Sequence, residues 1–401
     1  MKKVIIVYNQ SLKEVQGINY VNNSFVEGQK YFEQKGYVLT YIVSPNEVFD
    51  CKGKHNLDLI GCNISTASYK RERKLRTFLR VLLSSKYLLG ASIKYYFNHI
   101  RTAKKAIENL YRLNEEYDYI IFQDSMTANI YFNTTDEADR KKNILILHCS
   151  KDPCEQMRPQ FPALFNRKKW ESRIYANLNS VFSNIGKVIY LSQRAVDHSP
   201  VAPDKKTYIF NGEEDLADHA FVESGDVINC VSVASMSWHK GHEFVLEAMT
   251  KLPKEVLNKI KYHMIGAGPQ MQELKDYVAS HNLEDNVVFY GNRNDVPELL
   301  KGMDVFILPS KSEGLPMSII EALRQGMYLV ATDTGAIPEM IAPGCGELVE
   351  RNADQIADCL ARIVKDGMVT MEVKKKAREH YLENFTLKNM IYKYCDVLSK
   401  I

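Results

Sequence analysis

The chain has 401 residues, of which 45% are hydrophobic and 25% are charged, and its formal net charge is +3. This is the composition of an ordinary globular protein. The length exceeds what one hydrophobic core usually serves, so we expect two domains. The net charge is too small to indicate an acidic or a basic binding partner. Evidence about partners has to come from how the charges are distributed along the chain.

The N-terminus combines two lysines with an apolar run from Val4 to Tyr8. The run is short and lacks a small-residue cleavage site, so we expect a buried first strand in place of a signal peptide. No uninterrupted apolar run approaches the ~18 residues that a membrane span needs. The cysteines are scattered without a C-x-x-C pair, and the closest two, Cys149 and Cys154, lack zinc-like spacing. We therefore expect reduced thiols in a cytosolic protein.

Short β-branched runs alternate with longer helical patterns along the whole chain. In the first half the predicted strands are Val4–Tyr8, Leu39–Val43, Tyr119–Phe122, Ile144–Leu147 and Val188–Leu191. In the second half they are Asn229–Ala234, Tyr262–Ile265, Val287–Phe289, Val305–Leu308 and Tyr328–Ala331. Such alternation predicts an α/β fold of parallel sheets with helical crossovers, in which ligands collect in the loops that follow the strands.

A polar, acidic stretch over residues 213–226 separates the two series of strands, and the alternation restarts near residue 228. We therefore expect an N-terminal Rossmann-like domain over residues 1–218 and a C-terminal one over residues 219–383, each doubly wound. Residues 384–401 are expected to form a helix that packs back on the N-terminal domain.

Residues 69–112 are markedly basic. Their cations are Lys70, Arg71, Arg73, Lys74, Arg76, Arg80, Lys86, Lys94, Arg101, Lys104, Lys105 and Arg112. Only Glu72 and Glu108 oppose them, and leucines and aromatics interleave, which is typical of helices that lie on anionic membrane surfaces. In this interpretation the stretch from Arg167 to Trp170 extends the same surface. The alternative is an apolar side that faces the domain core with solvated charges outside. Nucleic-acid binding is not expected, because no recognised motif accompanies the charge.

Two loops of the second half carry residues suited to a phosphate-bearing ligand. After the strand that ends at Ala234, Lys240 opens a helix, and a lysine there can reach a diphosphate as a point charge. A solvated lysine at a helix start is the structural alternative. After the next strand, Gly266 and Gly268 form a Gly-rich turn, which suits either a nucleotide or simply a helix start at Pro269.

Residues 304–339 carry most of the functional signal. A strand is followed by a loop with Glu313 and Gly314, and Pro316 then fits the first turn of a helix that contains Glu321. The helix N-terminus offers N–H groups and a positive dipole end to anionic oxygens, and Gly314 lets backbone approach a ligand closely. The two carboxylates accept hydrogen bonds and therefore suit sugar hydroxyls. For Glu321 alone, the alternative is an acidic residue that the dipole favours early in a helix.

The string SEGLPMSIIEAL followed by ATDTGAIPEMI resembles the retaining glycosyltransferases of the GT-B fold, specifically the large family 4 type with its Glu-x7-Glu motif. The resemblance covers residues 205–345 and becomes diffuse over the earlier part of the chain. It implies two doubly wound Rossmann-like domains that face a central cleft, with the acceptor on the N-terminal domain and the nucleotide-sugar donor on the C-terminal one.

The resemblance implies roles for the residues of the Glu-x7-Glu segment. Glu313 would face the donor sugar hydroxyls and the reacting centre, and Glu321 would bind the ribose hydroxyls of the nucleotide. The backbone of Gly314, Leu315 and Pro316 would lie close to the sugar and the diphosphate.

Other donor contacts are implied for the neighbouring loops. Lys240 would neutralise the leaving diphosphate. The family often has an Arg five residues before this Lys, where this chain has Ser235, so Arg293 or a residue of the N-terminal domain would supply the second cationic contact. The residues implied to line the nucleotide pocket are Gly266, Gly268, Gly291, Asn292 and Arg293.

Three residues of the first half are implied by the same resemblance. His148, at a strand end, would contact the donor sugar and join Glu313 and Lys240 as a catalytic residue, although a structural histidine is the alternative. Asp124 is a strand-end candidate for the acceptor side. Gly17 is what remains of the paired glycines that many relatives have after the first strand, so we expect this loop to hold the donor differently.

The implied reaction transfers a hexosyl unit from a nucleotide diphosphate sugar, expected to be a UDP-sugar, to a hydroxyl of a saccharide acceptor with retention of configuration. The leaving phosphate helps to deprotonate the acceptor, so no dedicated base, metal or cofactor is expected. Asp304 and Asp333 stand alone and form no Asp-x-Asp metal motif. We expect a lipid-linked acceptor in surface polysaccharide synthesis and a cytoplasmic enzyme, peripheral at the inner face of the membrane.

Two rival functions remain open on the sequence. A sugar-nucleotide epimerase of the same fold would produce an epimer from the donor alone and would need further acid/base carboxylates. A non-catalytic nucleotide-sugar-binding subunit would usually lack one of the key groups, whereas this chain has Glu313, Glu321 and Lys240.

Overall fold

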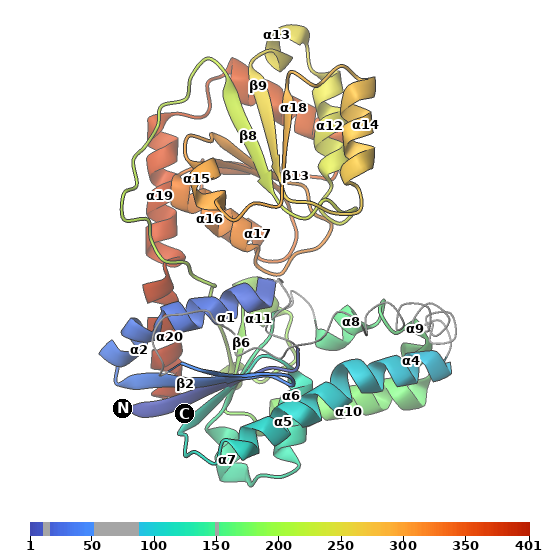
Figure 1. The fold of residues 1–401 in the computed structure, drawn as a ribbon, viewed down its shortest axis with the longest axis vertical. Helices are drawn as coiled ribbons and strands as arrows, with labels where there is room; N and C mark the ends of the chain where they lie inside the picture. Colours follow the sequence, from blue (N-terminus) through green and yellow to red (C-terminus); the bar gives the residue numbers. More distant parts are fainter. Residues whose placement is uncertain (11–16, 52–87, 149–151) are drawn as a thin grey trace, which may run out of the picture. The chain divides into compact units, whose positions relative to one another are not determined.

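Two sheets, one in each half of the chain, organise the molecule (Figure 1). The computed structural model describes residues 1–10, 17–51, 88–148 and 152–401. The first compact unit comprises Met1–Tyr190, Val196–Ile209 and Ile391–Ile401, and the second comprises Leu191–Ala195 and Phe210–Met390. Both units are α/β, as the alternation of strands and helices predicts.

The first unit is built on a seven-stranded sheet in the order β3-β2-β1-β4-β5-β6-β7. Its strands are β1 (Lys2–Val7), β2 (Tyr37–Val43), β3 (Val48–Asp50), β4 (Tyr119–Phe122), β5 (Ile144–Ile146), β6 (Lys187–Tyr190) and β7 (Lys206–Tyr208). Neighbours run parallel, with Val4 opposite Tyr119 in β1 and β4, except that β2 and β3 are antiparallel. The strands predicted for the first half are confirmed, while β3 and β7 are additional edge strands.

Helices cover both faces of this sheet (Figure 1). They are α1 (Gly17–Glu27), α2 (Gln29–Gln34), α4 (Leu88–Tyr95), α5 (Thr102–Arg112), α6 (Ser125–Phe132), α7 (Glu137–Lys141), α8 (Pro153–Met157), α9 (Pro162–Phe165), α10 (Lys168–Asn184) and α11 (Gln193–Asp197). A π-helical turn, η1 (Tyr96–Arg101), joins α4 to α5, and a 3-10 turn, η2 (Pro203–Lys205), precedes β7. Fully buried β-branched and aromatic side chains of the central strands supply the core, as expected for a parallel sheet covered on both sides.

The second unit is built on a six-stranded parallel sheet in the order β10-β9-β8-β11-β12-β13. Its strands are β8 (Ile228–Val233), β9 (Ile260–Ile265), β10 (Val287–Gly291), β11 (Val305–Leu308), β12 (Tyr328–Thr332) and β13 (Gly346–Val349). The strands predicted for the second half are confirmed, and β13 is an additional edge strand whose four residues are mostly half-exposed or exposed.

Helices also cover both faces of the second sheet, with α12, α14 and α18 on one face and α16 and α19 on the other (Figure 1). The helices are α12 (His242–Lys251), α13 (Lys254–Leu257), α14 (Met271–Ser280), α15 (Val296–Leu300), α16 (Met317–Gln325), α17 (Ile337–Met340), α18 (Ala353–Lys365), α19 (Met371–Asn384) and α20 (Leu387–Leu398). A buried ion pair fastens α19 to the sheet, because Lys374 Nζ lies 2.7 Å from Asp304 Oδ1 and the two side chains are 4% and 1% exposed.

The chain passes from the first unit to the second between Ile209 and Phe210, ahead of the predicted boundary after residue 218. The following residues belong to the second unit because Glu213 pairs with the end of α19: its N–H donates to Phe385 O at 3.0 Å, and its carbonyl accepts from Leu387 N at 2.8 Å. The chain returns to the first unit after Met390, within α20.

The later residues of α20 complete the core of the first unit. The ring of Tyr394 meets that of Phe25 edge-on, with centroids 5.0 Å apart, and both side chains are fully buried. Tyr392 Oη donates to Gln34 Oε1 at 2.6 Å. Among the residues that the structure describes, no helix combines the length and the apolar character that crossing a membrane requires.

Candidate functional site

The loops at the carboxyl end of the second sheet bring Lys240 and Glu313 together. Lys240 follows β8, Glu313 follows β11, and Lys240 Nζ lies 2.6 Å from Glu313 Oε1. The lysine side chain is 25% exposed and the glutamate side chain 10% exposed, so the pair is partly withdrawn from water. An ammonium and a carboxylate from adjacent strand ends therefore occupy one spot where a parallel sheet usually binds its ligand.

Close backbone packing between the two loops sets this pair. Gly241 has a positive φ of 74°, and a Cβ at this position would lie 2.3 Å from Pro309 O. No side chain fits there, which explains the glycine after Lys240. Lys311 N donates to His239 O at 2.7 Å, so the loop after β11 is also hydrogen-bonded to the loop after β8.

The Gly314–Pro316 segment leads into α16 and packs against the turn before α17. Gly314 O accepts from Ala336 N at 2.8 Å, and a Cβ on Gly335 would lie 2.3 Å from Glu313 O. Leu315 is buried, and Pro316 is the residue just before the helix, which begins at Met317. The segment is thus held at the amino end of α16, as the sequence predicts.

Glu321 lies on α16 beside a buried cluster of charges. Arg324 Nη1 lies 2.8 Å from Glu213 Oε1, and these side chains are 5% and 10% exposed. Burial raises the pKa of Glu321 to about 8, with a further upward contribution from the Glu213 carboxylate and an opposing one from Arg324. A ligand that donates hydrogen bonds to Glu321 would stabilise its ionised form and offset the cost of burying that charge.

The Gly-rich turn after β9 packs against the loop after β8. A Cβ on Gly266, whose φ is 133°, would lie 2.1 Å from Ala234 O, and a Cβ on Gly268 would lie 2.3 Å from Met236 O. Met236 N donates to Ala267 O at 3.1 Å. Both glycines are therefore required by loop packing, and their implied contact with a nucleotide stays a prediction.

Ser235 lies in the loop after β8, at the position where the related family often has an arginine. Its backbone carbonyl is hydrogen-bonded to the buried His242. His242 Nε2 donates to Ser235 O at 3.3 Å, and His242 Nδ1 accepts from Tyr262 Oη at 3.3 Å. Burial lowers the pKa of His242 to about 4, so this ring is neutral at pH 7. The sequence alone gave no signal for His242, because a lone histidine at a helix start belongs to no motif.

The end of β10 and the turn after it carry the remaining nucleotide candidates. Gly291 has a φ of 67°, and its carbonyl accepts from Gly266 N at 2.8 Å. Asn292 and Arg293 follow it and are exposed. Arg293 forms a two-point hydrogen-bonded pair with Asp295, at 2.8 Å from Nε and 2.6 Å from Nη2, so its guanidinium is engaged within its own loop.

In the first unit, His148 and Asp124 lie at the ends of the neighbouring strands β5 and β4. His148 Nε2 donates to Gln123 Oε1 at 2.5 Å, and burial lowers the pKa of His148 to about 4. Asp124 caps α6, because its carboxylate accepts from Thr127 N at 2.8 Å, and burial raises the pKa of Asp124 to about 6. Gln123 was not predicted, although its position directly after β4 was the available signal.

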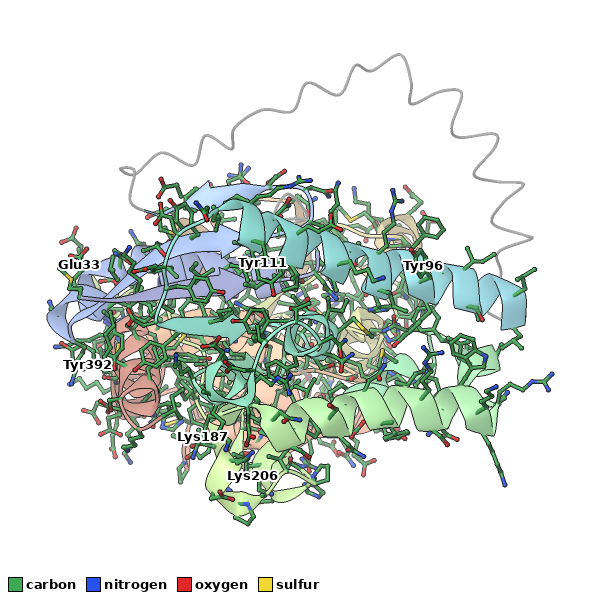
Figure 2. The ribbon with its side chains drawn as sticks, turned by 90° about the horizontal axis from the view of Figure 1, so that it is seen from below. Glu33, Tyr96, Tyr111, Lys187, Lys206 and Tyr392 are labelled. Atoms are coloured by element: carbon green, nitrogen blue, oxygen red, sulfur yellow. The ribbon has the colours of Figure 1, made fainter. Side chains whose placement is uncertain are left out.

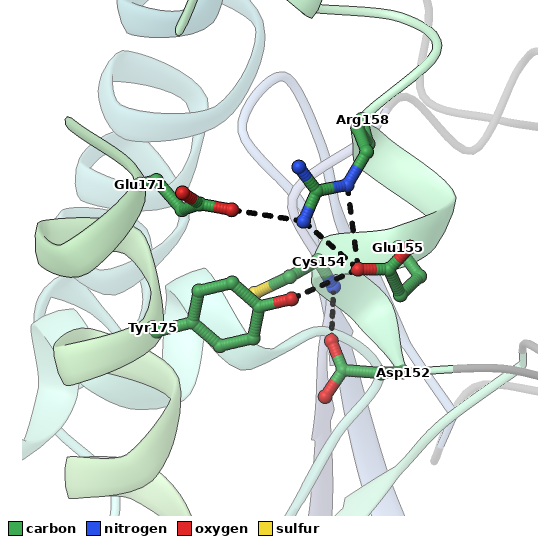
Figure 3. A network of polar contacts seen from close by, with 6 residues as sticks. All are labelled: Asp152, Cys154, Glu155, Arg158, Glu171 and Tyr175. Carbon is green, nitrogen blue, oxygen red and sulfur yellow. Dashed lines mark hydrogen bonds and ion pairs between the residues drawn. The ribbon is translucent and has the colours of Figure 1, made fainter. Parts of the chain in front are cut away.

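A polar network anchors the segment that follows the β5 loop (Figure 3). Arg158 Nη2 lies 3.0 Å from Glu155 and 2.9 Å from Glu171, and Tyr175 Oη donates to Glu155 at 3.0 Å. Asp152 caps α8. The network ties α8 to α10.

The predicted residues thus form two groups, one within each unit. His148 and Asp124 belong to the first unit, whereas Lys240, Glu313 and Glu321 belong to the second. Gly17 begins α1, and the loop before it lies outside the described residues.

Comparison with known families bears on the second group. Residues 215–380 match the family model described as Glycosyl transferases group 1. This stretch of the second unit is therefore similar to that family. The matched stretch includes Lys240 and the whole Glu313–Glu321 segment.

Curated relatives match the chain over part of their length. N-acetyl-alpha-D-glucosaminyl L-malate synthase of Bacillus anthracis is 30% identical over 152 residues, which cover 37% of the chain and 39% of that relative. UDP-Gal:alpha-D-GlcNAc-diphosphoundecaprenol alpha-1,3-galactosyltransferase of Escherichia coli is 30% identical over 137 residues, which cover 33% and 35%. The matched part of the chain thus spans well under half the length of these relatives.

Solved structures match both units. Anabaena HepE in complex with UDP superimposes with a TM-score of 0.66 at 15% identity, covering 100% of both chains. WaaG, a glycosyltransferase involved in lipopolysaccharide biosynthesis, superimposes with a TM-score of 0.62 at 14% identity, covering 99% of both chains. The chain therefore has the GT-B fold that the resemblance implied.

Proposed function

We propose that the protein is a retaining glycosyltransferase that transfers a hexosyl unit from a UDP-sugar to a hydroxyl of a saccharide acceptor. The observation that carries the proposal is the Lys240–Glu313 pair at the carboxyl end of the sheet in a group 1 domain. The family match alone would allow a degenerate binding domain. The pair supports catalysis because it supplies a cation and a carboxylate at the carboxyl end of the sheet, where parallel sheets usually bind ligands.

In the proposed reaction the bond from the anomeric carbon to the diphosphate oxygen breaks, and a bond to the acceptor oxygen forms on the same face. The acceptor proton passes to an oxygen of the leaving diphosphate, so atoms and charge balance without a separate base. Lys240 stabilises the negative charge that grows on the diphosphate, and the N-terminus of α16 adds its dipole. Glu313 accepts hydrogen bonds from the sugar hydroxyls. We propose that no metal or cofactor takes part.

Glu321 is proposed to accept hydrogen bonds from the ribose hydroxyls. Its environment supports this role, because burial and Glu213 hold its pKa well above the ordinary range. Hydrogen bonds from a bound ribose favour the ionised carboxylate and would lower that pKa. Binding of the nucleotide is then linked to loss of a proton from Glu321.

The identity of the substrates is proposed from the relatives. HepE was solved with UDP, and the name of the E. coli relative gives UDP-Gal and a GlcNAc-diphosphoundecaprenol as its substrates. A uridine nucleotide and a lipid-linked saccharide are therefore the donor and acceptor classes that we propose here. His148 and Asp124 are proposed to serve the sugar and the acceptor from the first unit.

A helical run of the first unit is proposed to touch an anionic membrane surface. Within α4, η1 and α5, Leu89, Tyr96 and Phe97 are 74%, 44% and 47% exposed. Figure 2 labels Tyr96 on this helical run. Exposed cations share this run: Lys94, Arg101, Lys104 and Lys105. Exposed aromatics beside cations suit the boundary between lipid headgroups and acyl chains. The cations from Lys70 to Lys86 lie outside the described residues.

The decisive test is a panel of nucleotide sugars scored first by thermal stabilisation and then by release of UDP. We expect UDP and one UDP-sugar to raise the unfolding temperature, and the same UDP-sugar to be consumed faster when a saccharide acceptor is added. Product analysis by NMR then reports the anomeric configuration. Consumption of donor to an epimer, or stabilisation without any turnover, would contradict the proposal.

A further inference from the structure

Arg351 bridges the two loops that carry the Lys240–Glu313 pair. It follows β13, and its Nε donates to Pro309 O at 3.1 Å while its Nη2 donates to Trp238 O at 2.6 Å. Pro309 opens the loop that carries Glu313, and Trp238 lies two residues before Lys240. One guanidinium thus joins the backbones of loops that come from different strands.

The guanidinium is itself held in place. Its Nη2 lies 3.5 Å from Glu243 Oε1, and its Cζ lies 4.8 Å from the centroid of the Phe244 ring. Both residues belong to the first turn of α12, and the Arg351 side chain is only 25% exposed. A planar fork with fixed donor directions keeps its geometry when it is stacked and paired, which a lysine ammonium cannot match.

Arg351 adds a side-chain link to loops that the backbone and the Lys240–Glu313 pair also join. The Lys311–His239 hydrogen bond and the close approach of Gly241 to Pro309 O need no particular side chain. The link through Arg351 depends on one residue that no sequence motif singles out.

We propose that Arg351 is a positioning residue for glycosyl transfer, which holds Lys240 and Glu313 at the spacing that the diphosphate and the sugar require. A misplacement of ~1 Å at reacting groups can cost about 10²-fold in rate, so a remote guanidinium that sets two loops has room for a large effect. The inference rests on the proposed function for the reaction, whereas the loop geometry can be measured without any substrate.

Three variants separate this role from simple stability. Arg351→Met keeps an apolar stem against Phe244 and removes both donors. Arg351→Lys keeps a charge opposite Glu243 but offers a point cation in place of the fork. Arg362→Met is the matched control, because Arg362 lies on α18 and pairs with Glu347, at the surface and away from both loops.

The first measurement is hydrogen exchange, without nucleotide, in peptides that cover residues 236–241 and 307–313. We expect Arg351→Met to exchange about tenfold faster in both peptides, Arg351→Lys to lie between, and Arg362→Met to match the wild type. Unchanged exchange in Arg351→Met would overturn the bridging role.

The second measurement is steady-state release of UDP from the UDP-sugar that stabilises the wild type most. We expect Arg351→Met to lower kcat about tenfold or more with a change below about threefold in KM, partial recovery in Arg351→Lys, and an unfolding temperature close to that of Arg362→Met. Wild-type kcat in Arg351→Met would overturn the proposal while leaving the proposed function intact. A wild-type protein that turns over no UDP-sugar would overturn both.

Discussion

Replacing Lys240 by methionine tests the central contact of the site. The substitution keeps an unbranched apolar stem of nearly the same length and removes the ammonium that lies 2.6 Å from Glu313 Oε1. Two effects follow from the structure. The leaving diphosphate loses its cationic partner, and the Glu313 carboxylate, whose side chain is 10% exposed, loses its counter-ion.

The size of the first effect follows from the distance and the surroundings. A unit charge ~4 Å from another contributes about 4 kcal/mol at an effective dielectric of about 20, which suits a partly buried site. Each ~1.4 kcal/mol corresponds to a tenfold change in rate, so we expect Lys240→Met to lower kcat about 10²- to 10³-fold. The second effect should lower the free energy of unfolding by about 1–3 kcal/mol, because a buried carboxylate is left unpaired.

The assay is release of UDP under saturating donor, together with urea unfolding of the same preparations. Lys251→Met is the control, since Lys251 ends α12, which begins two residues after Lys240, and its ion pairs with Glu247 and Asp354 lie at the surface. Adding Glu313→Gln to Lys240→Met should restore part of the lost stability and none of the lost turnover. A kcat for Lys240→Met within about threefold of wild type would refute the proposed role of the ammonium.

Four further predictions address other parts of the molecule. Glu321 binds its proton more tightly in the folded state, so without ligand its contribution to stability is present at low pH and is lost as pH rises from about 4.5 towards about 8. Glu321→Gln should therefore flatten the dependence of the unfolding free energy on pH, measured by urea unfolding. An unchanged pH dependence would contradict the pKa of about 8. Lys374→Met should lower the unfolding free energy by about 3–5 kcal/mol, because it leaves the Asp304 carboxylate buried without its counter-ion. The control Lys376→Met removes an exposed pair and should cost at most about 1 kcal/mol. Equal costs would contradict the stabilising role of the buried Lys374–Asp304 pair. Phe97→Ser should weaken binding to phosphatidylglycerol vesicles about tenfold, and equal binding would favour a merely solvated face. EDTA should leave turnover unchanged, and a loss that Mg²⁺ reverses would show that a metal takes part.

Most strands that could be predicted are largely buried, although β10 was predicted with only Val287 buried. Strands such as β11 and β12 have every residue buried, so they read as continuous apolar runs that composition alone identifies. The edge strands β3, β7 and β13 have three or four residues, most of them partly exposed, and so lack such a run. Their pairing is decided by neighbours far away in the sequence.

The positions of the candidate site residues could be predicted where several of them lie in one short segment. They could not be predicted where a single residue contacts loops that are distant in the sequence. Glu313 was placed correctly at the amino end of a helix because loop and helix start are contiguous. The direct contact between Glu313 and Lys240 rests on strand order, which only the folded sheet supplies. Arg351 was missed for the same reason, and Arg293 was considered for a phosphate although Asp295, two residues later, engages it.

The shared helix α20 has a consequence for biosynthesis. Tyr394 and its neighbours belong to the unit that contains Phe25, so the earliest part of the chain to leave the ribosome lacks a piece of its own interior until residues 391–401 have followed. The second unit has no such dependence on these residues. We therefore expect the later-made half to become protease-resistant on its own, while a nascent N-terminal half stays open to proteolysis until residues 391–401 have left the ribosome.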